Sequence, residues 1–132
     1  MSKKNLLIVD DDSDYVYVVK RCLQKWPNVG EIMIAENGKV ALDIIENGDS
    51  NRSRPDIVLL DLNMPVMSGE ELLDELDQKW GTEAAPKTPE IFVITSSDSP
   101  RDRARSESNR FVRRFLMKPV ACATLHEHLH AC

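Results

Sequence analysis

Five short apolar runs of mainly Ile, Leu and Val are the feature that most constrains the fold of this chain. The runs show little alternation with polar residues, which is typical of strands buried on both faces in a parallel sheet. We therefore predict five strands in one covered sheet. The runs are Leu6–Val9, Ile32–Ala35, Ile57–Leu60, Ile91–Thr95 and Phe115–Met117.

The segments between the runs have the period of a helix. Apolar residues recur at three- and four-residue steps within residues 15–26, 40–45 and 72–80, which predicts three amphipathic helices. Pro27, Asn47-Gly48 and Gly81 follow these stretches and are residues that end helices.

The last two helices have weaker signals. Ser99-Pro100 is a good helix start, a cap residue followed by proline. Within the segment 99–110, however, Ala104 is almost the only apolar residue. We expect that helix to be weakly held. A final helix runs from Ala121 to His130. The alternation of strand and helix predicts an α/β fold, a doubly wound five-stranded parallel sheet flanked by five helices.

Length and charge exclude several classes of protein. The 132 residues suit one domain, and we expect a single domain over 1–132. A net charge of −5, from 17 basic and 22 acidic residues, gives no electrostatic reason to bind nucleic acid or an anionic membrane. The first apolar run is too short for a signal peptide, and no stretch could span a bilayer. We expect a cytoplasmic protein.

The three cysteines, Cys22, Cys122 and Cys132, are odd in number and widely spaced. This pattern favours neither a disulfide framework nor a four-cysteine zinc site. We expect reduced thiols.

Candidate site residues stand at the ends of four of the five apolar runs. In an open α/β sheet, ligands bind outside the carboxyl ends of the strands, so these residues should meet at one edge. Any one aspartate there could merely cap the next helix; the combination points to a site. The residues are Asp10, Asp11 and Asp12 after the first run, Asp61 after the third, Thr95, Ser96 and Ser97 at the fourth, and Lys118 and Pro119 after the fifth.

Carboxylates that converge in this way repel one another, and a bound cation removes the repulsion. All-oxygen ligation with few protein ligands favours Mg²⁺. A divalent ion beside a carboxylate, a hydroxyl and an ammonium can support phosphoryl transfer.

These residues stand in four motifs that resemble the receiver domain of response regulators in two-component signalling. The resemblance covers residues 5–129, and the motifs are Leu-Ile-Val-Asp10-Asp11, Asp-Ile-Val-Leu-Leu-Asp61-Leu-Asn-Met-Pro65 with Ser-Gly69, Ile-Thr95-Ser-Ser, and Phe115-Leu-Met-Lys118-Pro119.

The resemblance implies that Asp61 accepts a phosphoryl group from a phosphohistidine of a sensor histidine kinase or phosphotransfer protein. It also implies Mg²⁺ held by the side chains of Asp11 and Asp61 and by the backbone carbonyl of Asn63, with Asp10 acting mostly through water. The chain would be a stand-alone receiver without an output domain, acting through protein contact. The sequence does not decide between a monomer and a homodimer.

Lys118, Thr95 and Phe115 complete the expected mechanism. Lys118 can pair with Asp61 at rest and with a phosphoryl oxygen afterwards. Thr95 can donate its hydroxyl to another phosphoryl oxygen, which draws its loop inward. The resemblance implies that Phe115 then swings inward, without the hydroxyl of the Tyr often found at this position. Asn63 and Ser97 flank the site and are expected to tune the lifetime of the acyl phosphate.

The chain departs from the receiver pattern before the fifth run, where many receivers carry a Gly-Ala-Asp-type turn and this chain has residues 108–114. The wider stretch Arg101–Arg114 is basic. It holds six Arg against Asp102 and Glu107, a local charge of +4. Such a stretch can be a solvated face. The alternative is that it docks an acidic downstream partner.

The sequence argues against three other functions. His126-Glu127-His128-Leu129-His130 matches the H-E-x-x-H zinc pattern, but a third ligand and a cleft are not evident there. An aspartyl-phosphate phosphatase of the dehalogenase type would need Asp where Asn63 stands. A docking module that is never phosphorylated would not need the acidic pair with Asp61, Thr95 and Lys118.

Overall fold

The structure is a computed structural model of the chain that describes residues 3–49, 53–64, 66–80, 89–96 and 99–130. One parallel sheet of five strands forms its centre, in the order β2-β1-β3-β4-β5. The strands are β1 (Lys4–Val9), β2 (Val29–Ala35), β3 (Ile57–Leu60), β4 (Glu90–Thr95) and β5 (Val112–Met117). All five predicted strands are confirmed; four of them begin one to three residues earlier than the apolar runs.

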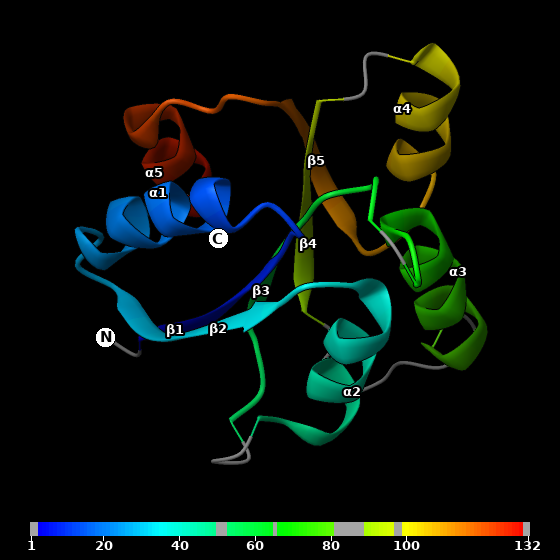
Figure 1. Cartoon of the computed structure of the whole chain (residues 1–132), viewed down its shortest axis with the longest axis horizontal. Helices are drawn as coiled ribbons and strands as arrows, with labels where there is room; N and C mark the ends of the chain where they lie inside the picture. Colours follow the sequence, from blue (N-terminus) through cyan, green and yellow to red (C-terminus); the bar gives the residue numbers. More distant parts are fainter. Residues whose placement is uncertain (1–2, 50–52, 65, 81–88, 97–98, 131–132) are drawn as a thin grey trace.

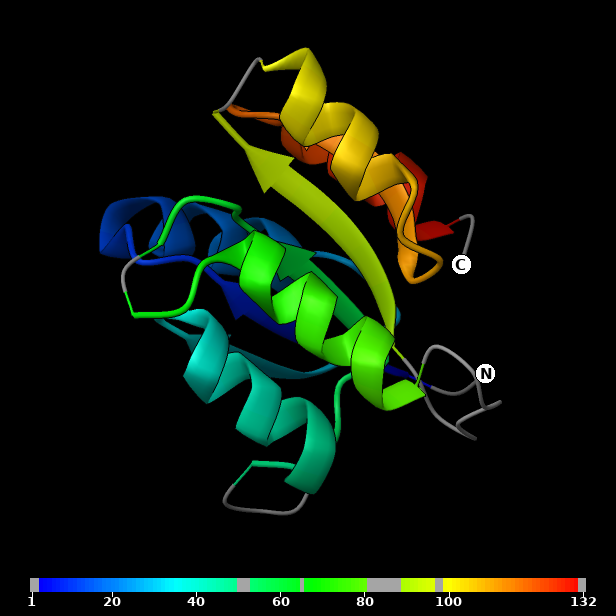
Figure 2. The ribbon, with the colours of Figure 1, turned by 90° about the vertical axis from the view of Figure 1, so that its right-hand side faces the viewer.

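Five helices alternate with the strands along the chain. They are α1 (Ser13–Gln24), α2 (Gly38–Asn47), α3 (Gly69–Trp80), α4 (Pro100–Glu107) and α5 (Cys122–His130). Helices α1 and α5 lie together on one face of the sheet, and α2, α3 and α4 lie on the other (Figures 1 and 2). The predicted doubly wound α/β fold is therefore confirmed.

Two apolar clusters bury the two faces of the sheet. Alternate strand residues divide between them: Leu7 and Val58 face α2 and α3, whereas Leu6 and Ile57 face α1 and α5. Burial on both faces explains why the strand sequences are almost continuously apolar.

Helix α4 contributes least to these clusters. Its single buried residue is Ser106, and Ala104 is exposed. The predicted thin apolar stripe is confirmed. Ion pairs join α4 to α3 instead: the Arg105 guanidinium lies 2.6 Å from Glu70 and 2.6 Å from Asp74.

The expectation of reduced thiols is wrong for two of the three cysteines. Cys22 on α1 and Cys122 at the start of α5 form a disulfide. Their Cα atoms are 5.7 Å apart although 100 residues separate them in sequence, because the fold places α1 beside α5. Linear spacing carries no information about such a pair. Cys132 lies outside the described residues.

None of the helices in the described ranges is both long and apolar enough to cross a membrane.

Candidate functional site

The carboxyl ends of β1 and β3 bring Asp10 and Asp61 together. These strands are neighbours in register, with Val9 opposite Leu60, and each aspartate is the next residue of its strand. The Asp61 amide donates to the Val9 carbonyl at 2.9 Å, which continues the ladder into the site. Both side chains are nearly buried.

Asp11 completes an acidic cluster with Asp10 and Asp61. One carboxylate oxygen of each residue lies within 4.8 Å of the others. Asp11 is exposed, so the cluster opens to solvent on its side. Asp12 does not join the cluster, because its carboxylate accepts the amides of Asp14 and Tyr15 and caps α1.

Lys118 lies at the end of β5 and points into this cluster. Its Nζ is 2.7 Å from Asp10 Oδ2 and 3.4 Å from Asp61 Oδ2. Burial alone would lower the pKa of Lys118, but the hydrogen bond to Asp10 and the charge of Asp61 outweigh it, so that its pKa is raised. The ammonium is therefore firmly charged and partly neutralises the two carboxylates.

The Asp61 carboxyl has a raised pKa. Burial is the largest cause, and the nearby Asp10 carboxylate adds to it, while Lys118, the Asn63 amide and Thr95 act in the opposite direction. Without a further cation, the ionised carboxylate of Asp61 is less stable here than in water.

Thr95 and Asn63 reach Asp61 from two sides. Thr95 is fully buried at the end of β4 and hydrogen-bonds to Asp61. The Asn63 amide lies 3.4 Å from Asp61 Oδ1, whereas its side chain is exposed. Asn63 therefore stands at the solvent-exposed rim of the cluster.

Phe115 lies inside before any phosphorylation. Phe115 is already buried, within the cluster that faces α2 and α3, and the Arg103 guanidinium lies 5.6 Å from the centre of its ring. Ser97 and Pro65 lie outside the described residues.

Tyr15 belongs to the site, although its spacing suggested only a core position on a helix. Lys118 Nζ lies 4.4 Å from the centre of the Tyr15 ring, which is within the range of a cation–π contact. Burial raises the pKa of Tyr15 against the opposing effect of Lys118. The sequence held one signal for this role: Tyr15 lies in the first turn of the helix that directly follows the aspartates.

Gly69 allows the loop after β3 to close against the site. A Cβ atom at this position would lie 2.3 Å from the Asp61 carbonyl oxygen and 2.8 Å from Leu62 Cα. Only glycine permits this approach of two backbone segments.

The sequence profile of the response regulator receiver domain matches residues 6–130. The chain belongs to the response regulator receiver family. It is thus related to phosphoacceptor proteins of two-component signalling, and this confirms the resemblance inferred from the four motifs.

Relatives of this receiver differ in overall length. It is 32% identical over 117 residues to the "Probable methanogenesis regulatory protein FilR2" of Methanothrix harundinacea (strain 6Ac), covering 88% of this chain and 72% of that protein. It is 35% identical over 119 residues to the "Protein-glutamate methylesterase/protein-glutamine glutaminase" of Desulfotalea psychrophila (strain LSv54 / DSM 12343), covering 90% of this chain but only 30% of that enzyme.

A solved structure supports the same fold. The Mn(2+)-bound form of response regulator Rcp1 matches with a TM-score of 0.77 and 26% identity, covering 97% of this chain and 90% of that one.

The H-E-x-x-H pattern on α5 does not form a zinc site among the described residues. Within those ranges, His126 groups with Cys22 and Cys122, and His130 joins neither group of clustered metal-ligating side chains. His130 packs edge-on to Trp26, and His128 packs edge-on to Phe92. The two outer histidines of the pattern therefore have separate surroundings.

Proposed function

We propose that this receiver accepts a phosphoryl group on Asp61 from the phosphohistidine of a sensor histidine kinase or a phosphotransfer protein. The observation that carries the proposal is the placement of Asp61. Its carboxylate lies between an ammonium and a hydroxyl, those of Lys118 and Thr95, and beside two further carboxylates.

The transfer is a substitution at phosphorus. An oxygen of the Asp61 carboxylate forms a bond to phosphorus, the bond from phosphorus to the donor imidazole nitrogen breaks, and that nitrogen takes up a proton. Lys118 then pairs with a phosphoryl oxygen in place of the Asp61 carboxylate, and Thr95 donates its hydroxyl to another.

The donor set fits Mg²⁺. Three carboxylates with oxygens close together, and no nitrogen or sulfur ligand among them, suit a hard cation. We propose that Asp11 and Asp61 bind the ion directly with the carbonyl of Asn63, and that Asp10 acts through water. Bound Mg²⁺ would offset the negative charge of the cluster and of the phosphoryl group.

The conformational response would pass from Thr95 to Phe115. Thr95 pairs with Met117 across β4 and β5, and Phe115 pairs with Val93. Movement of Thr95 toward a phosphoryl oxygen would therefore alter the packing that holds Phe115. Because Phe115 is already buried, the response would be a repacking of its ring.

A small acyl phosphate or phosphoramidate, with Mg²⁺ and the full chain, tests the proposal. We expect an intact-mass gain of one phosphoryl group that hydroxylamine removes, as it does for an acyl phosphate. Chelation of Mg²⁺ and Asp61→Asn should both abolish the gain. Asp56→Asn is the matched control, because Asp56 precedes the same strand at its opposite end. An equal gain in Asp61→Asn would refute the assignment.

The kinase or phosphotransfer partner would approach over α1. A groove of about 410 Å³ adjoins the acidic cluster, and Asp10, Asp11, Val16 and Tyr17 contribute to its lining. Tyr17, which lines the groove, and Val18, which follows it on α1, are about 60% exposed, and adjoining exposed apolar side chains can mark an interaction site. We propose that an amphipathic helix carrying the donor histidine lies here.

Substitution of Val18 separates this docking surface from the chemistry. Val18→Glu should slow transfer from a phosphorylated histidine protein by at least tenfold and leave the reaction with a small phosphodonor unchanged. Lys25→Glu, at the far end of α1, is the control. Equal rates of protein-to-protein transfer in Val18→Glu and the unaltered chain would contradict the proposed surface.

We propose Arg101–Arg114 as the surface for an acidic downstream partner. Intramolecular ion pairs already engage part of its charge: Arg105 with Glu70 and Asp74, Arg103 with Glu107, Arg110 with Asp77, and Arg113 with Glu90. Charge reversal at Arg105 or Arg110 would therefore disturb the fold as well as the surface. Arg101→Glu with Arg114→Glu is the cleaner test, and unchanged partner binding would contradict the assignment.

We further propose that the protein acts in the cytoplasm, where its phosphodonor is made.

We also propose that Asn63 and Ser97 set the lifetime of the acyl phosphate. Exchange of Asn63 for Ala should change the rate of dephosphorylation without changing the site of phosphorylation. An unchanged rate would remove Asn63 from this role.

A further inference from the structure

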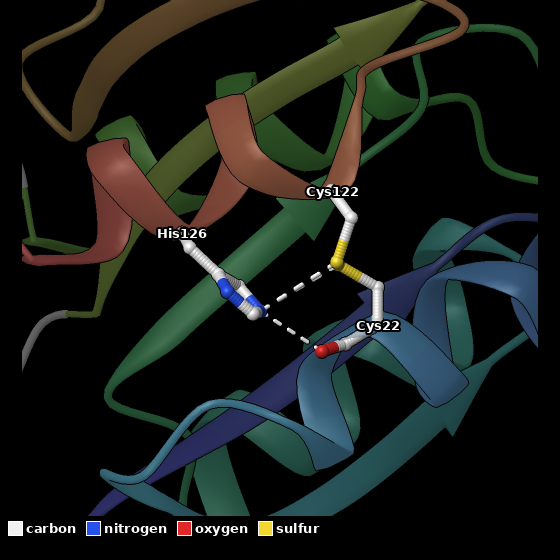
Figure 3. The surroundings of a disulfide bond; sticks show 3 residues. All are labelled: Cys22, Cys122 and His126. Atoms are coloured by element: carbon white, nitrogen blue, oxygen red, sulfur yellow. Dashed lines mark hydrogen bonds between the residues drawn. A yellow bond between two sulfur atoms is a disulfide. The ribbon is translucent and has the colours of Figure 1, made fainter.

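A second cluster of reactive side chains lies away from the acidic site, between α1 and α5. Cys22 and Cys122 are joined there, and the His126 ring lies beside the bond (Figure 3). His126 Nε2 is 3.7 Å from each of the two sulfur atoms. Nothing in the phosphoacceptor chemistry uses these three residues.

The hydrogen bonds of His126 show which ring nitrogen carries the proton. His126 Nε2 lies 2.9 Å from the Cys22 carbonyl oxygen, and a carbonyl oxygen only accepts. His126 Nε2 must therefore be the donor. Both sulfur atoms lie 3.7 Å from this protonated nitrogen, so its partial positive charge is close enough to stabilise the negative charge that develops on a departing thiolate.

The two sulfurs differ in access to solvent. Cys22 is 8% exposed and packs in the apolar cluster under α1 and α5, whereas Cys122 is exposed at the first position of α5. A thiol from solution can therefore attack the sulfur of Cys122 and leave Cys22 as the thiolate beside the His126 N–H.

We propose that Cys22 and Cys122 are a reversible redox modification site, with His126 as its positioning residue, and that the disulfide locks α5 onto α1. In reduction, a low-molecular-weight thiolate attacks Cys122 Sγ, forms a mixed disulfide and releases the Cys22 thiolate, which takes up a proton. A second thiolate attacks the outer sulfur and releases Cys122. Two external thiols thus become one external disulfide, and oxidation by such a disulfide is the reverse.

The disulfide would restrain α1 and α5, the two helices that follow site residues in the chain. Helix α1 begins directly after Asp10–Asp12, and α5 begins four residues after Lys118. At the site end, α1 contacts the segment that leads into α5, through Tyr15 and Lys118. The disulfide is a second, covalent tie between them, and its reduction should free α5 more than any other helix.

Thiol counting on the full chain tests the reversible bond. The Cys132→Ser variant, which lacks the third thiol, is equilibrated with mixtures of reduced and oxidised glutathione. A maleimide then labels the free thiols, and intact mass spectrometry counts the labels. We expect two labels under reducing conditions, none under oxidising conditions, and recovery of both labels on reversal. Two labels even in excess oxidised glutathione, or only stable glutathione adducts, would overturn the proposal.

Variants separate the roles of the three residues. Cys22→Ser and the exposed Cys122→Ser should each leave one thiol that forms only mixed disulfides; the second variant serves if the first does not fold. His126→Ala should slow reduction by glutathione about tenfold, His126→Gln, which keeps an N–H donor, should restore part of the rate, and His130→Ala on the same helix should not change it. Equal rates in all four proteins would remove His126 from the site.

Hydrogen exchange tests the lock. Amides of α5 should exchange at least tenfold faster in the reduced protein than in the oxidised protein, with α3 as the unaffected reference. Equal exchange in α5 would contradict the lock.

Zinc binding tests the competing assignment. The reduced protein is mixed with equimolar Zn²⁺ and passed through a desalting column. Retention of one Zn²⁺ that is lost in Cys122→Ser would identify a metal site and overturn the redox assignment.

Discussion

The Lys118 ammonium lies closer to Asp10 than to Asp61, with Nζ to oxygen distances of 2.7 Å and 3.4 Å. Lys118 thus stands where it neutralises a carboxylate of the cluster, and it competes with any cation that binds there.

Lys118→Ala should strengthen Mg²⁺ binding, because it removes the competing positive charge. We expect about a tenfold lower dissociation constant, since a charge pair at this distance is worth about 1–4 kcal/mol near a protein surface. Titration calorimetry measures the change, with Lys25→Ala as the control. Weaker binding in Lys118→Ala would show that Lys118 helps to build the ion site.

Asp61→Asn should stabilise the protein at pH 7.5 without Mg²⁺, by about 1 kcal/mol in the free energy of unfolding, the order of one carboxylate repulsion. The folded-state pKa of Asp61 is raised, so the unaltered protein carries this penalty above that pKa. It regains stability as the pH falls through the folded pKa, and below the unfolded pKa both states are neutral. The advantage of Asp61→Asn should therefore shrink as the pH is lowered.

Urea unfolding from pH 7.5 down to pH 4.5 measures this prediction. Added Mg²⁺ should reverse the order of stability, because only the unaltered site would retain the full ligand set. A destabilised Asp61→Asn in Mg²⁺-free buffer would contradict the expected repulsion.

Gly69→Ala should lower the free energy of unfolding by about 1–3 kcal/mol, the usual cost of overpacking. The new methyl group would collide with the backbone of Asp61 and Leu62, so phosphorylation of Asp61 should slow as well. Gly30→Ala is the matched control, because its Cβ would lie closest to the Asn5 side chain and no nearer than 3.1 Å to a backbone atom. Equal losses in both variants would show that the loop at Gly69 can yield.

Arg105→Ala should loosen α4. It removes two ion pairs to α3, and exposed pairs are each worth about 0.2–1 kcal/mol. Hydrogen exchange should quicken in α4, and the loss of stability should fade at high salt. Arg101→Ala on the same helix provides the comparison. If both variants behave alike, the ion pairs of Arg105 do not hold the helix.

Val66→Gly should raise the free energy of unfolding by about 1 kcal/mol. Val66 has a φ of 66° and is exposed, so its β-branched side chain is strained and loses little packing when removed. Val18→Gly, an exposed valine within α1, should destabilise instead. Urea denaturation distinguishes the two signs.

The order of elements and the acidic edge could both be predicted from the sequence. Strands buried on both faces must be apolar throughout, so their positions are visible without the fold, and Asp10, Asp61, Thr95 and Lys118 follow directly from where those strands end. Even the thin packing of α4 follows from composition, because a helix without apolar residues has nothing to bury.

Contacts between distant segments could not be predicted in this way. The role of Tyr15 depends on α1 passing beside Lys118, and the pairing of the basic Arg105 depends on α3 lying next to α4. The strain at Val66 depends on the path of its loop.

The sequence by itself thus determined the strands, the helices and the residues at the acidic edge, because burial and strand ends are local properties of the chain. Only the tertiary structure decided that Cys22 and Cys122 are bonded beside His126. Their 100-residue separation is closed by the packing of α5 on α1, and that distance is a property of the folded chain alone.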